Sequence, residues 1–573
     1  MFELVKVRNN EEIASGIFRL KLESMIKAKP GQFVMLEPSY PFSVVPRPFS
    51  VYRQNAGSIE VVIKKVGPNT EAYNLLKPGD SIVVSGPLGN PIVLPPAARY
   101  LLIAGGMGLA GLYFLAKDLI RRGQEVGIYF GTRGIEEQFG VFELARLGCE
   151  VKTITENNLN RRGYVIDLLD EELAKGDKDF VIVACGPKPM LKKVAQLAET
   201  YHIDCKVIIE EMMACGVGSC KSCAVFVNNS HMPLHVCHDG PTFDASIIDW
   251  EKFCPEEKVE IVERKPLIKD PFKTVLVGQK GRILKLDYPI MNGAGTLDTL
   301  AIESKQVDVS KFGAILTKGI CMDARPGNPM PRICEINGGF LNRIGLEGWG
   351  IAEFKQRYLP IWQSFGKKVI VTIFGKSINE YGVLADIFQS LGIEVIEMNL
   401  SCGNTEGRIF AQSEELTYQA VERVRQLFSG FLMVKLTPMV SNIVEIARAA
   451  VSGGADALTL INTPLGMSID VMTGKSKIAG NYAGMSGGVI RPLGVRMVHQ
   501  VASENLGVPI VGVGGIANGY DAAEYLMAGA SAIQIGTALF SNLEAGITIC
   551  NDLMRIAFHH GVEKISDLIG MCK

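Results

Sequence analysis

Hydrophobic and polar residues alternate in short runs along the first hundred positions of the chain. FRLKLES (18–24), GQFVMLE (31–37), SIEVVIKKV (58–66) and DSIVVSG (80–86) show this alternation, and Gly- or Pro-containing segments separate them. A period of two over runs of this length is typical of strands with one buried face. The pattern predicts a small antiparallel β-barrel over residues 1–97.

A longer alternation of strand-like and helix-like segments follows between residues 98 and 205. LLIAGG, EVGIYFGT and DFVIVACGP are apolar runs, and the last leads into the helical pattern KPMLKKVAQLAETY. This order predicts a doubly wound α/β domain that binds a nucleotide. The longest apolar run, 100–116, is interrupted by four glycines and is shorter than a membrane span, so we interpret it as a strand, a turn and a helix start.

The last part of the chain, 272–573, repeats one kind of unit eight times. Each unit is a β-like run followed by helical periodicity, and the runs are YPIMNGAG, FGAILTKG, KVIVTIFG, IEVIEMNLS, FLMVKLT, ADALTLIN, VPIVGVGG and SAIQIGT. Eight such units have the rhythm of a (β/α)8 TIM barrel, whose active site forms at the carboxyl ends of its strands. Between the predicted domains lie a small cysteine-rich domain, 206–262, and a charged linker, 263–271.

Composition narrows the class of protein. The chain has 573 residues, of which 47% are hydrophobic and 21% charged, so it is not a disordered chain. Its net charge of −1 gives no reason to expect nucleic acid or a membrane surface as partner. The 13 cysteines are mostly scattered, and the N-terminus lacks a signal-peptide core. We therefore expect a soluble, cytoplasmic protein with a small-molecule substrate.

Four cysteines lie close together in a spacing that binds metal. Cys215-x4-Cys220-x2-Cys223 followed by Cys237 matches the plant-type [2Fe–2S] pattern, and two glycines in the loop ease its turns. The alternative is a structural zinc site, but zinc ribbons pair two C-x2-C units and this segment has one. The spacing predicts a [2Fe–2S] cluster, which carries one electron at a time and so needs redox partners on both sides.

Four segments upstream of the cysteines resemble the ferredoxin–NAD(P)H reductase superfamily in kind and order: RPFS (47–50), GPLGN (86–90), GGMG (105–108) and CGP (185–187). The glycine turn between a strand and a helix can bring a dinucleotide phosphate to the helix-start amides. The resemblance implies an FAD site formed by Arg47, Pro48, Phe49, Ser50, Asn69 and Thr70. It implies an NAD site formed by Gly105, Gly106, Cys185, Gly186 and Pro187, while Arg133 leaves NADP open.

The whole chain resembles class 1B (NAD-dependent) dihydroorotate dehydrogenase. With MMACGVGSCKSC and VCHDGPTF included, residues 1–262 are similar to the electron-transfer subunit of that family. RPGNPMPRI, NLSC, VKLTP, INTPLGMSID, GVGGI and IQIGTA are similar to its catalytic subunit, so the chain resembles a fusion of the two. The resemblance implies oxidation of dihydroorotate to orotate in pyrimidine biosynthesis, with electrons passing from FMN to [2Fe–2S] to FAD to NAD+. It also suggests a homodimer through the barrel.

The resemblance implies two sets of residues at the barrel's strand ends. Glycines after the seventh and eighth strands suit a phosphate, and a lysine on the fifth strand would favour reduced flavin. The FMN set is Lys318, Asn399, Lys435, Ile461, Gly487, Gly514, Gly515, Gly536 and Thr537. Amide side chains both donate and accept hydrogen bonds, which suits a ring of alternating N–H and C=O groups. The substrate set is Lys318, Asn342, Ile344, Gly345, Leu346, Asn399, Asn404, Asn462 and Thr463.

Cys402 is the candidate catalytic base, because a thiol with an ordinary pKa of about 8.5 can accept the substrate's C5 proton where its site favours thiolate. The shell around these residues departs from the family pattern at Ala294, Arg343, Gly348, Trp349, Thr372 and Gly403. Two alternatives therefore stay open. One is a paralogous flavin and iron–sulfur oxidoreductase for another cyclic amide or pyrimidine-like ring. The other is an NADH-driven electron-transfer protein, against which the intact Lys318, Asn399, Cys402 and Asn462 argue.

Overall fold

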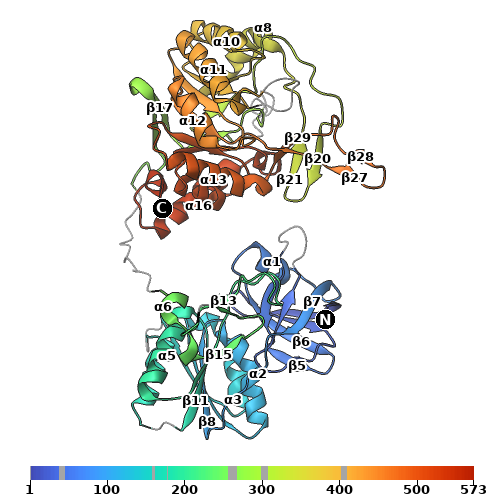
Figure 1. Ribbon diagram of the computed structural model, residues 1–573, viewed down its shortest axis with the longest axis vertical. Coiled ribbons are helices and arrows are strands. Elements are labelled where there is room, and N and C mark those ends of the chain that lie inside the picture. The colour runs from blue at the N-terminus through green and yellow to red at the C-terminus, as the bar shows by residue number, and fades with distance from the viewer. Residues whose placement is uncertain are drawn as a thin grey trace. The chain divides into compact units, whose positions relative to one another are not determined.

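The computed structural model describes residues 2–37, 45–157, 162–176, 179–230, 232–255, 268–297, 308–401 and 409–572. The chain divides into two compact units, 1–259 and 260–573, which we call the N-terminal and C-terminal units. Figure 1 colours the first from blue to green and the second from green to red.

The N-terminal unit begins with one antiparallel sheet of seven strands. They are β1 (Phe2–Ala14), β2 (Ile17–Glu23), β3 (Phe33–Leu36), β4 (Arg47–Ser50), β5 (Arg53–Asn55), β6 (Ser58–Lys64) and β7 (Ser81–Leu88), in the order β4-β3-β7-β1-β2-β6-β5. The sheet curls until β4 contacts β6, and it encloses apolar residues such as Leu20, Leu22 and Val61. Helix α1 (Pro68–Asn74) follows β6. This confirms the predicted antiparallel barrel, and the alternating residues of β2 are the ones that it buries.

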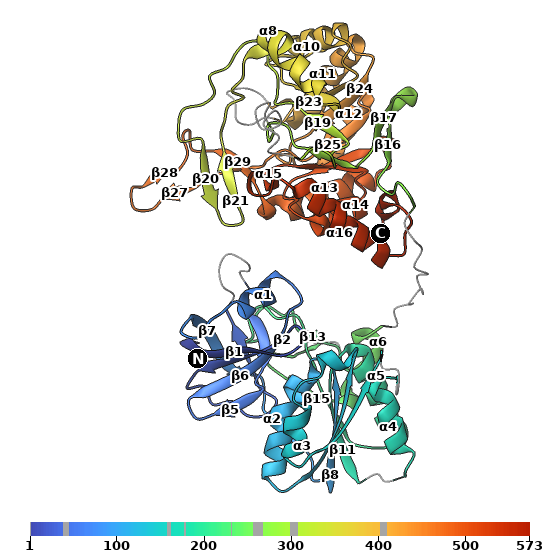
Figure 2. The ribbon, with the colours of Figure 1, turned by 180° about the vertical axis from the view of Figure 1, so that it is seen from behind.

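A doubly wound α/β sheet follows, as predicted. Its parallel strands are β8 (Arg99–Gly105), β9 (Glu125–Thr132), β10 (Glu150–Thr155), β11 (Phe180–Cys185) and β12 (Cys205–Ile208), in the order β10-β9-β8-β11-β12. Helices α2 (Gly108–Arg121) and α3 (Val141–Arg146) pack on one face, and α4 (Val165–Leu173) and α5 (Lys188–Tyr201) on the other (Figure 2). The strand order reverses between β8 and β11, where ligands bind in sheets of this kind.

The cysteine-rich segment is anchored to this sheet. A short hairpin of β13 (Ala224–Val225) and β14 (Leu234–His235) follows the cysteine loop. Strand β15 (Thr242–Asp244) then pairs antiparallel with β12, and helix α6 (Trp250–Phe253) ends the described part of the unit. The loop that carries the first three cysteines therefore runs from strand β12 to the β13–β14 hairpin.

The C-terminal unit is a closed parallel barrel of eight strands, and each predicted β-like run contains one of them. The strands are β18 (Ile290–Asn292), β19 (Ala314–Leu316), β22 (Lys368–Ile373), β23 (Val395–Asn399), β24 (Phe431–Lys435), β25 (Ala457–Leu460), β30 (Ile510–Val513) and β31 (Ala532–Ile535). The described helices around it are α8 (Gly350–Glu353), α9 (Leu359–Ser364), α10 (Ile378–Ser390), α11 (Glu414–Leu427), α12 (Ile443–Ser452), α13 (Arg491–Ala502), α14 (Gly519–Met527), α15 (Ala538–Ser541) and α16 (Ala545–His559). The TIM barrel is thus confirmed.

Two additions complete the barrel. A hairpin of β16 (Thr274–Val277) and β17 (Ile283–Leu286) covers the amino ends of the strands, where Leu276, Leu284 and Leu286 pack on Phe431 and other apolar lumen residues. Outside the barrel, β20 (Ile333–Ile336), β21 (Gly339–Asn342), β29 (Ala483–Ser486) and β26 (Leu465–Gly466) form a small sheet, and β27 (Ile469–Asp470) pairs with β28 (Lys475–Ser476). These short strands were not predicted, because runs of two to four residues carry too little periodicity.

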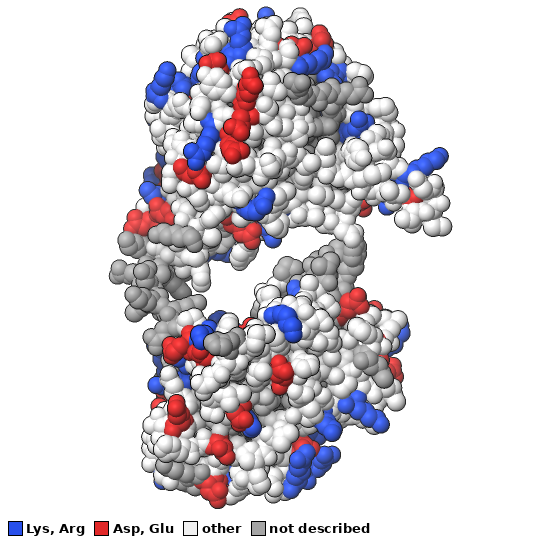
Figure 3. All heavy atoms as spheres, in the orientation of Figure 1, with Lys and Arg blue, Asp and Glu red and all other residues white. Residues whose placement is uncertain are grey.

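Charged residues are mixed over the surface. On the face drawn in Figure 3, basic and acidic side chains are interspersed over each unit. This agrees with the balance of 59 Lys and Arg against 60 Asp and Glu in the whole chain.

Candidate functional site

The four clustered cysteines form two pairs. The Sγ atoms of Cys223 and Cys237 lie 3.3 Å apart, and both residues are buried. The backbone N–H of Cys220 donates to Cys215 Sγ at 3.3 Å, which holds the other two residues together. In a [2Fe–2S] cluster each iron takes two thiolates besides the bridging sulfides, so four cysteines in two pairs fit that group.

The backbone of the cysteine loop also points toward sulfur. The Gly218 N–H donates to Cys237 Sγ at 3.1 Å and the Val217 N–H to Cys215 Sγ at 3.5 Å. These turns need the left-handed φ of Gly216 (+70°) and Gly218 (+81°), and a Cβ on Gly216 would lie 2.9 Å from a Leu88 methyl group. Hydrogen bonds to the sulfurs stabilise thiolates and tune the potential of a cluster.

The cysteine thiols differ in proton affinity. Hydrogen bonds from the Ser222 side chain and backbone, and from Cys215, lower the pKa of the exposed Cys220 to about 6. Burial, together with the neighbouring Cys223 thiol, raises the pKa of Cys237 to about 12. A cysteine binds cluster iron as the thiolate, so binding at Cys237 would release its thiol proton. Among the described residues, no group of three or more His, Cys, Asp or Glu side chains is placed to hold a single metal ion.

The predicted FAD and NAD residues meet beside helix α2. RPFS is strand β4, and a Cβ built on Gly111 of α2 would lie 3.4 Å from Ser50 Oγ and 3.2 Å from Cys185 Sγ. Ser50 belongs to the antiparallel sheet and Cys185 to the α/β sheet. Both can lie close to helix α2 because Gly111 has no side chain. The Thr70 hydroxyl accepts from the Val66 and Gly67 N–H groups at 2.9 and 3.1 Å. The Asn69 side chain lies outside the described residues.

Bare backbone lines the carboxyl ends of β8 and β11. A Cβ on Gly105 would lie 2.9 Å from Pro187 Cδ, and one on Gly108 would lie 1.9 Å from the Cys185 carbonyl oxygen. The end of β11 and the residues after it can therefore contact the end of β8 and the start of α2 only because Gly105 and Gly108 are glycines. Helix α2 begins at Gly108, and no side chain caps the N–H groups of Gly108 and Leu109. This cradle at the topological switch point fits a dinucleotide phosphate.

A connected group of amide and hydroxyl side chains lies at the carboxyl end of the barrel. The Asn399 carbonyl Oδ1 accepts from the Ser401 hydroxyl at 3.0 Å and from Asn462 Nδ2 at 3.3 Å. Asn462 Nδ2 also donates to Ser401 Oγ at 2.8 Å, and Asn462 Oδ1 accepts from the Thr463 N–H at 2.8 Å. Sequence reasoning missed Ser401, although it directly precedes Cys402 in the NLSC motif.

The small outer sheet brings Asn342 to the same place. Asn342 Nδ2 donates to the Gly484 carbonyl across β21 and β29 at 3.1 Å. A Cβ on Gly484 would lie 2.3 Å from Thr463 Oγ1 and 3.5 Å from Asn342 Nδ2. The structure thus gathers Asn342, Asn399, Asn462 and Thr463 from the predicted substrate set. Asn404 of that set and the candidate base Cys402 lie outside the described residues.

The loop after β21 has an unusual backbone. Gly345 and Leu346 have φ values of +80° and +55°, and a leucine in this region costs conformational energy. Two hydrogen bonds between the backbones of Arg325 and Gly348, 2.8 and 3.0 Å long, and an Arg332–Glu347 ion pair hold the loop. Consecutive N–H groups in such a turn form a concavity that binds anions.

Lys318 lies near this loop. A hydrogen bond from Arg332, assisted by the charge of Lys318, lowers the pKa of Glu347. A Cβ on Gly319, the next residue after Lys318, would lie 3.3 Å from the Leu346 side chain. A positive charge thus stands beside the unusual turn.

Two of the residues that depart from the family pattern, Arg343 and Trp349, make contacts away from the amide and hydroxyl group at the barrel end. The Arg343 guanidinium donates to the Ala479 carbonyl at 3.2 Å, and Trp349 stacks on Tyr358 with ring centres 6.4 Å apart. Trp349 stays exposed.

Glycines after β29 and β30 form a second cradle, and Gly536 lies directly after β31. Gly487, Gly514 and Gly515 have φ values of +101°, +127° and +71°. A Cβ on Gly515 would lie 2.8 Å from the Gly487 carbonyl oxygen, whereas one on Gly536 would meet its nearest atom at 3.9 Å. Exposed backbone with room beside it at this end of a barrel fits the phosphate of FMN. Lys435, nearly buried at the end of β24, donates to Gln534 Oε1 at 3.3 Å.

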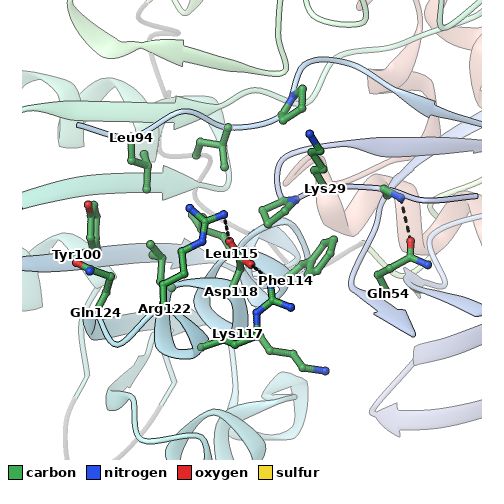
Figure 4. Close-up of a pocket in the computed structure, with 16 residues that line it drawn as sticks. Lys29, Gln54, Leu94, Tyr100, Phe114, Leu115, Lys117, Asp118, Arg122 and Gln124 are labelled. Atoms are coloured by element: carbon green, nitrogen blue, oxygen red, sulfur yellow. Dashed lines mark hydrogen bonds and ion pairs between the residues drawn. The ribbon is translucent and has the colours of Figure 1, made fainter. Parts of the chain in front are cut away.

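A cavity of about 630 Å³ lies elsewhere in the N-terminal unit (Figure 4). It lies between Lys29, the connection around Ile92 and the later turns of α2, where Arg121 and Arg122 both pair with Asp118. None of the predicted site residues lines it. Tyr100, near the start of β8, lines the cavity, whereas the glycine cradle lies at the other end of that strand. The cavity and the cradle are therefore separate places.

Three parts of the chain each match a known protein family. Residues 5–91 match the oxidoreductase FAD-binding domain, 210–249 the iron–sulfur cluster binding domain of dihydroorotate dehydrogenase B, and 279–556 dihydroorotate dehydrogenase. The dihydroorotate dehydrogenase B (NAD(+)) catalytic subunit of Geotalea uraniireducens is 40% identical over 290 residues, which are 50% of this chain and 95% of that protein. That of Caldicellulosiruptor saccharolyticus is 41% identical over 289 residues, or 50% and 96%.

Among solved structures, a chain of NADH-dependent reduced ferredoxin-NADP oxidoreductase matches with 29% identity and a TM-score of 0.41. The match covers 44% of this chain and 91% of that one.

The fold and its sites define a multidomain oxidoreductase with flavin and iron–sulfur domains and a TIM barrel. The chain belongs to the dihydroorotate dehydrogenase family, and it carries FAD-binding and iron–sulfur domains ahead of the catalytic domain. The resemblance predicted from the sequence is thereby confirmed. In the described part of the chain, no helix has both the length and the apolar character of a membrane span.

Proposed function

We propose that this enzyme oxidises dihydroorotate to orotate and delivers the electrons to NAD+. The observation that carries the proposal is the group formed by Asn399, Ser401 and Asn462 at the carboxyl end of the barrel, with Asn342 and Thr463 beside it. The substrate loses a hydride from C6 and a proton from C5, and a C5=C6 double bond forms. FMN, held by Lys435 and the glycines of the second cradle, would supply an acceptor for the hydride's two electrons, and the cluster and FAD would supply the path from there to NAD+.

The amide group would hold the substrate ring. Asn399 Oδ1 already accepts hydrogen bonds from Ser401 and Asn462, which turns the Asn399 NH2 group outward as a donor for ring carbonyls. The carboxylate of dihydroorotate would bind the N–H groups of Ile344, Gly345 and Leu346, with the charge of Lys318 nearby. Recognition would therefore combine ring amides with one anionic group.

Cys402 is our proposed base for the C5 proton. It follows Ser401, which the structure holds between two asparagines, and the proposal for Cys402 itself rests on the sequence motif. Lys435, with the glycines of the second cradle, would bind FMN. In the N-terminal unit we propose FAD at Arg47–Ser50 and Thr70, and NAD+ at Gly105, Gly106 and Cys185–Pro187.

We also propose the four-domain division given by the sequence pattern, and a homodimer through the barrel. The family models support the order of the parts, because their three matches fall within 1–97, 206–262 and 272–573. Light scattering of the purified protein tests the dimer, and a mass of one chain would contradict it.

The decisive experiment is anaerobic mixing of the holoenzyme with dihydroorotate and NAD+. We expect orotate and NADH in equal amounts. A protein that carries both flavins and the cluster but forms neither product would refute the proposal. A panel of other cyclic amides would then test the paralogous substrate. Cys402→Ala should abolish reduction by dihydroorotate but leave reduction by NADH, which separates the base from the electron-transfer half.

A further inference from the structure

Glu397 is a carboxylic acid buried inside the lumen of the barrel. It lies on β23 and is fully excluded from solvent. Its Oε2 accepts from Gln534 Nε2 at 2.6 Å and from the Thr459 hydroxyl at 3.0 Å. Its Oε1 has no hydrogen-bond partner among the described residues. Thr459 and Gln534 are also fully buried, so the strands β23, β25 and β31 each contribute one polar residue to this layer.

A carboxylate in such a place needs a compensating cation, because transferring an unpaired charge from water costs far more than its hydrogen bonds return. Lys435 stands on β24, in register with Asn399 on β23, and is 7% exposed. Its Nζ lies 3.3 Å from Gln534 Oε1. Gln534 thus contacts the ammonium with one end of its amide and the carboxylate with the other.

The orientation of the Gln534 amide follows from this arrangement. A carboxylate oxygen accepts hydrogen bonds, so Gln534 Nε2 has to face Glu397. The Gln534 carbonyl then faces Lys435, which can only donate. The three side chains therefore form a hydrogen-bonded chain in which Lys435 donates to Gln534 and Gln534 donates to Glu397. A change in the charge or position of Glu397 thus alters the position of the Lys435 ammonium.

We propose that Glu397 is a positioning residue for Lys435. Through Gln534 it fixes the ammonium at the end of β24, and its negative charge offsets part of the lysine's positive charge. Since reduced flavin carries negative charge that Lys435 stabilises, Glu397 limits how strongly reduction of the barrel flavin is favoured. The inference rests on the proposed function, in which Lys435 lies beside the FMN ring.

The test is the flavin reduction equilibrium in full-length holoenzyme. Wild type and Glu397→Gln are titrated anaerobically with dithionite and a redox dye, and flavin bleaching is followed. We expect the equilibrium constant for two-electron reduction of one flavin to rise about tenfold, which is about 30 mV. The other flavin should not change. Lys435→Gln should move the same transition in the opposite direction, which assigns it to the barrel.

A charge exchange separates electrostatics from simple structural damage. In the double variant Glu397→Gln/Gln534→Glu the carboxylate moves next to Lys435, while the composition and volume of the layer are kept. The reduction equilibrium should return to the wild-type value or pass below it. Damage to packing would instead shift the double variant the same way as the single one, and that result would overturn the proposal.

A matched pair of threonine variants covers the case in which Glu397→Gln does not fold. Thr459→Val removes a hydrogen bond to Glu397 and should shift the same flavin in the same direction by a smaller factor. Thr417→Val makes the same chemical change at an equally buried threonine of α11, whose hydroxyl donates to the Phe410 carbonyl at 3.2 Å, and should shift neither flavin.

The outcomes also separate this inference from the proposed function. Unchanged flavin equilibria in folded Glu397→Gln, or in Thr459→Val where that variant alone folds, would refute the role of Glu397. Failure of wild type to reduce its flavins with dihydroorotate would refute the substrate instead, because the dithionite titration does not depend on it. A wild-type barrel that binds no FMN would refute both.

Discussion

Arg53 on strand β5 forms an ion pair with Glu143 on helix α3, and this pair joins the antiparallel sheet to the α/β domain. Arg19 on β2 reaches the same carboxylate at 3.3 Å. The Arg53 guanidinium also lies 4.7 Å from the centre of the Tyr113 ring on α2. One carboxylate thus fixes two strands of the proposed FAD domain against the proposed NAD domain.

We expect Glu143→Gln to slow electron exchange between FAD and NAD severalfold, because the spacing of the two domains becomes less defined. The loss of stability should be about 1 kcal/mol, since the pair is partly exposed. Stopped-flow reduction of the enzyme by NADH measures the first effect, and flavin reduction by dihydroorotate should not change. Glu23→Gln breaks an ion pair with Arg8 within the antiparallel sheet and serves as the control. Equal effects of both variants would contradict the role of Glu143.

Glu172 on α4 should make stability depend on pH. Burial favours its neutral form, but hydrogen bonds from Lys175, Tyr129, Arg99 and Lys152 outweigh burial and hold the pKa of Glu172 well below its ordinary value. A lowered pKa in the folded state means that the unfolded chain takes up the proton first. The stabilisation is therefore complete at neutral pH and is lost as the pH falls below the ordinary value, about 4.3.

The measurement compares thermal unfolding of wild type and Glu172→Gln between neutral pH and the acid limit of solubility. At neutral pH we expect wild type to be more stable by about 2 kcal/mol. The difference should shrink on acidification. A difference that stays constant, or grows toward low pH, would show that the cluster around Glu172 does not hold its charge.

Asp456 should be one of the most sensitive positions for stability of the barrel. It is fully buried, and its carboxylate binds Arg282 Nε and Arg425 Nη1 at 2.9 Å as well as the N–H groups of Gln279 and Leu432. Asp456→Asn leaves two arginines without their counter-charge, and we expect a loss of about 3–5 kcal/mol.

Denaturant unfolding of the C-terminal unit, followed through FMN release, checks the effect of Asp456→Asn. The control is Glu394→Gln, which removes an exposed carboxylate 3.4 Å from Lys368 and should cost less than about 1 kcal/mol. Comparable losses for both variants would mean that burial of Asp456 carries no special energy.

Ser401→Ala should weaken substrate binding more than it slows the chemical step. Its hydroxyl contacts Asn399 Oδ1 and Asn462 Nδ2, so its removal frees both amides to rotate. We expect KM for dihydroorotate to rise about tenfold, which corresponds to about 1.4 kcal/mol, and kcat to change less. Steady-state kinetics with NAD+ decide this. Ser413→Ala, at the N-cap of α11, should lower stability alone.

Much of the fold could be predicted because parallel barrel strands are buried on both faces and therefore form apolar runs. All eight were found in this way, and the cysteine spacing alone indicated the cluster. The outer sheet was not predicted, since β26 has only two residues, Leu465–Gly466, and its partners lie far apart in sequence. Glu397 and Gln534 were missed because a polar residue inside an apolar run has no local pattern that reveals what it contacts across the lumen.

The hairpin β16–β17 bears on the electrostatics of the barrel interior. Leu276, Leu284 and Leu286 pack on apolar lumen residues at the amino ends of the strands, so a layer of apolar side chains covers that end of the barrel. The polar layer of Glu397, Thr459 and Gln534 therefore has apolar side chains on the amino side of the barrel and the proposed substrate site on its carboxyl side. Under the proposed function, bound substrate would shield the carboxyl end of the barrel from water. Charges inside the lumen would then interact more strongly, because the local permittivity is low. Substrate binding would in this way strengthen the electrostatic interactions among the buried side chains of the lumen.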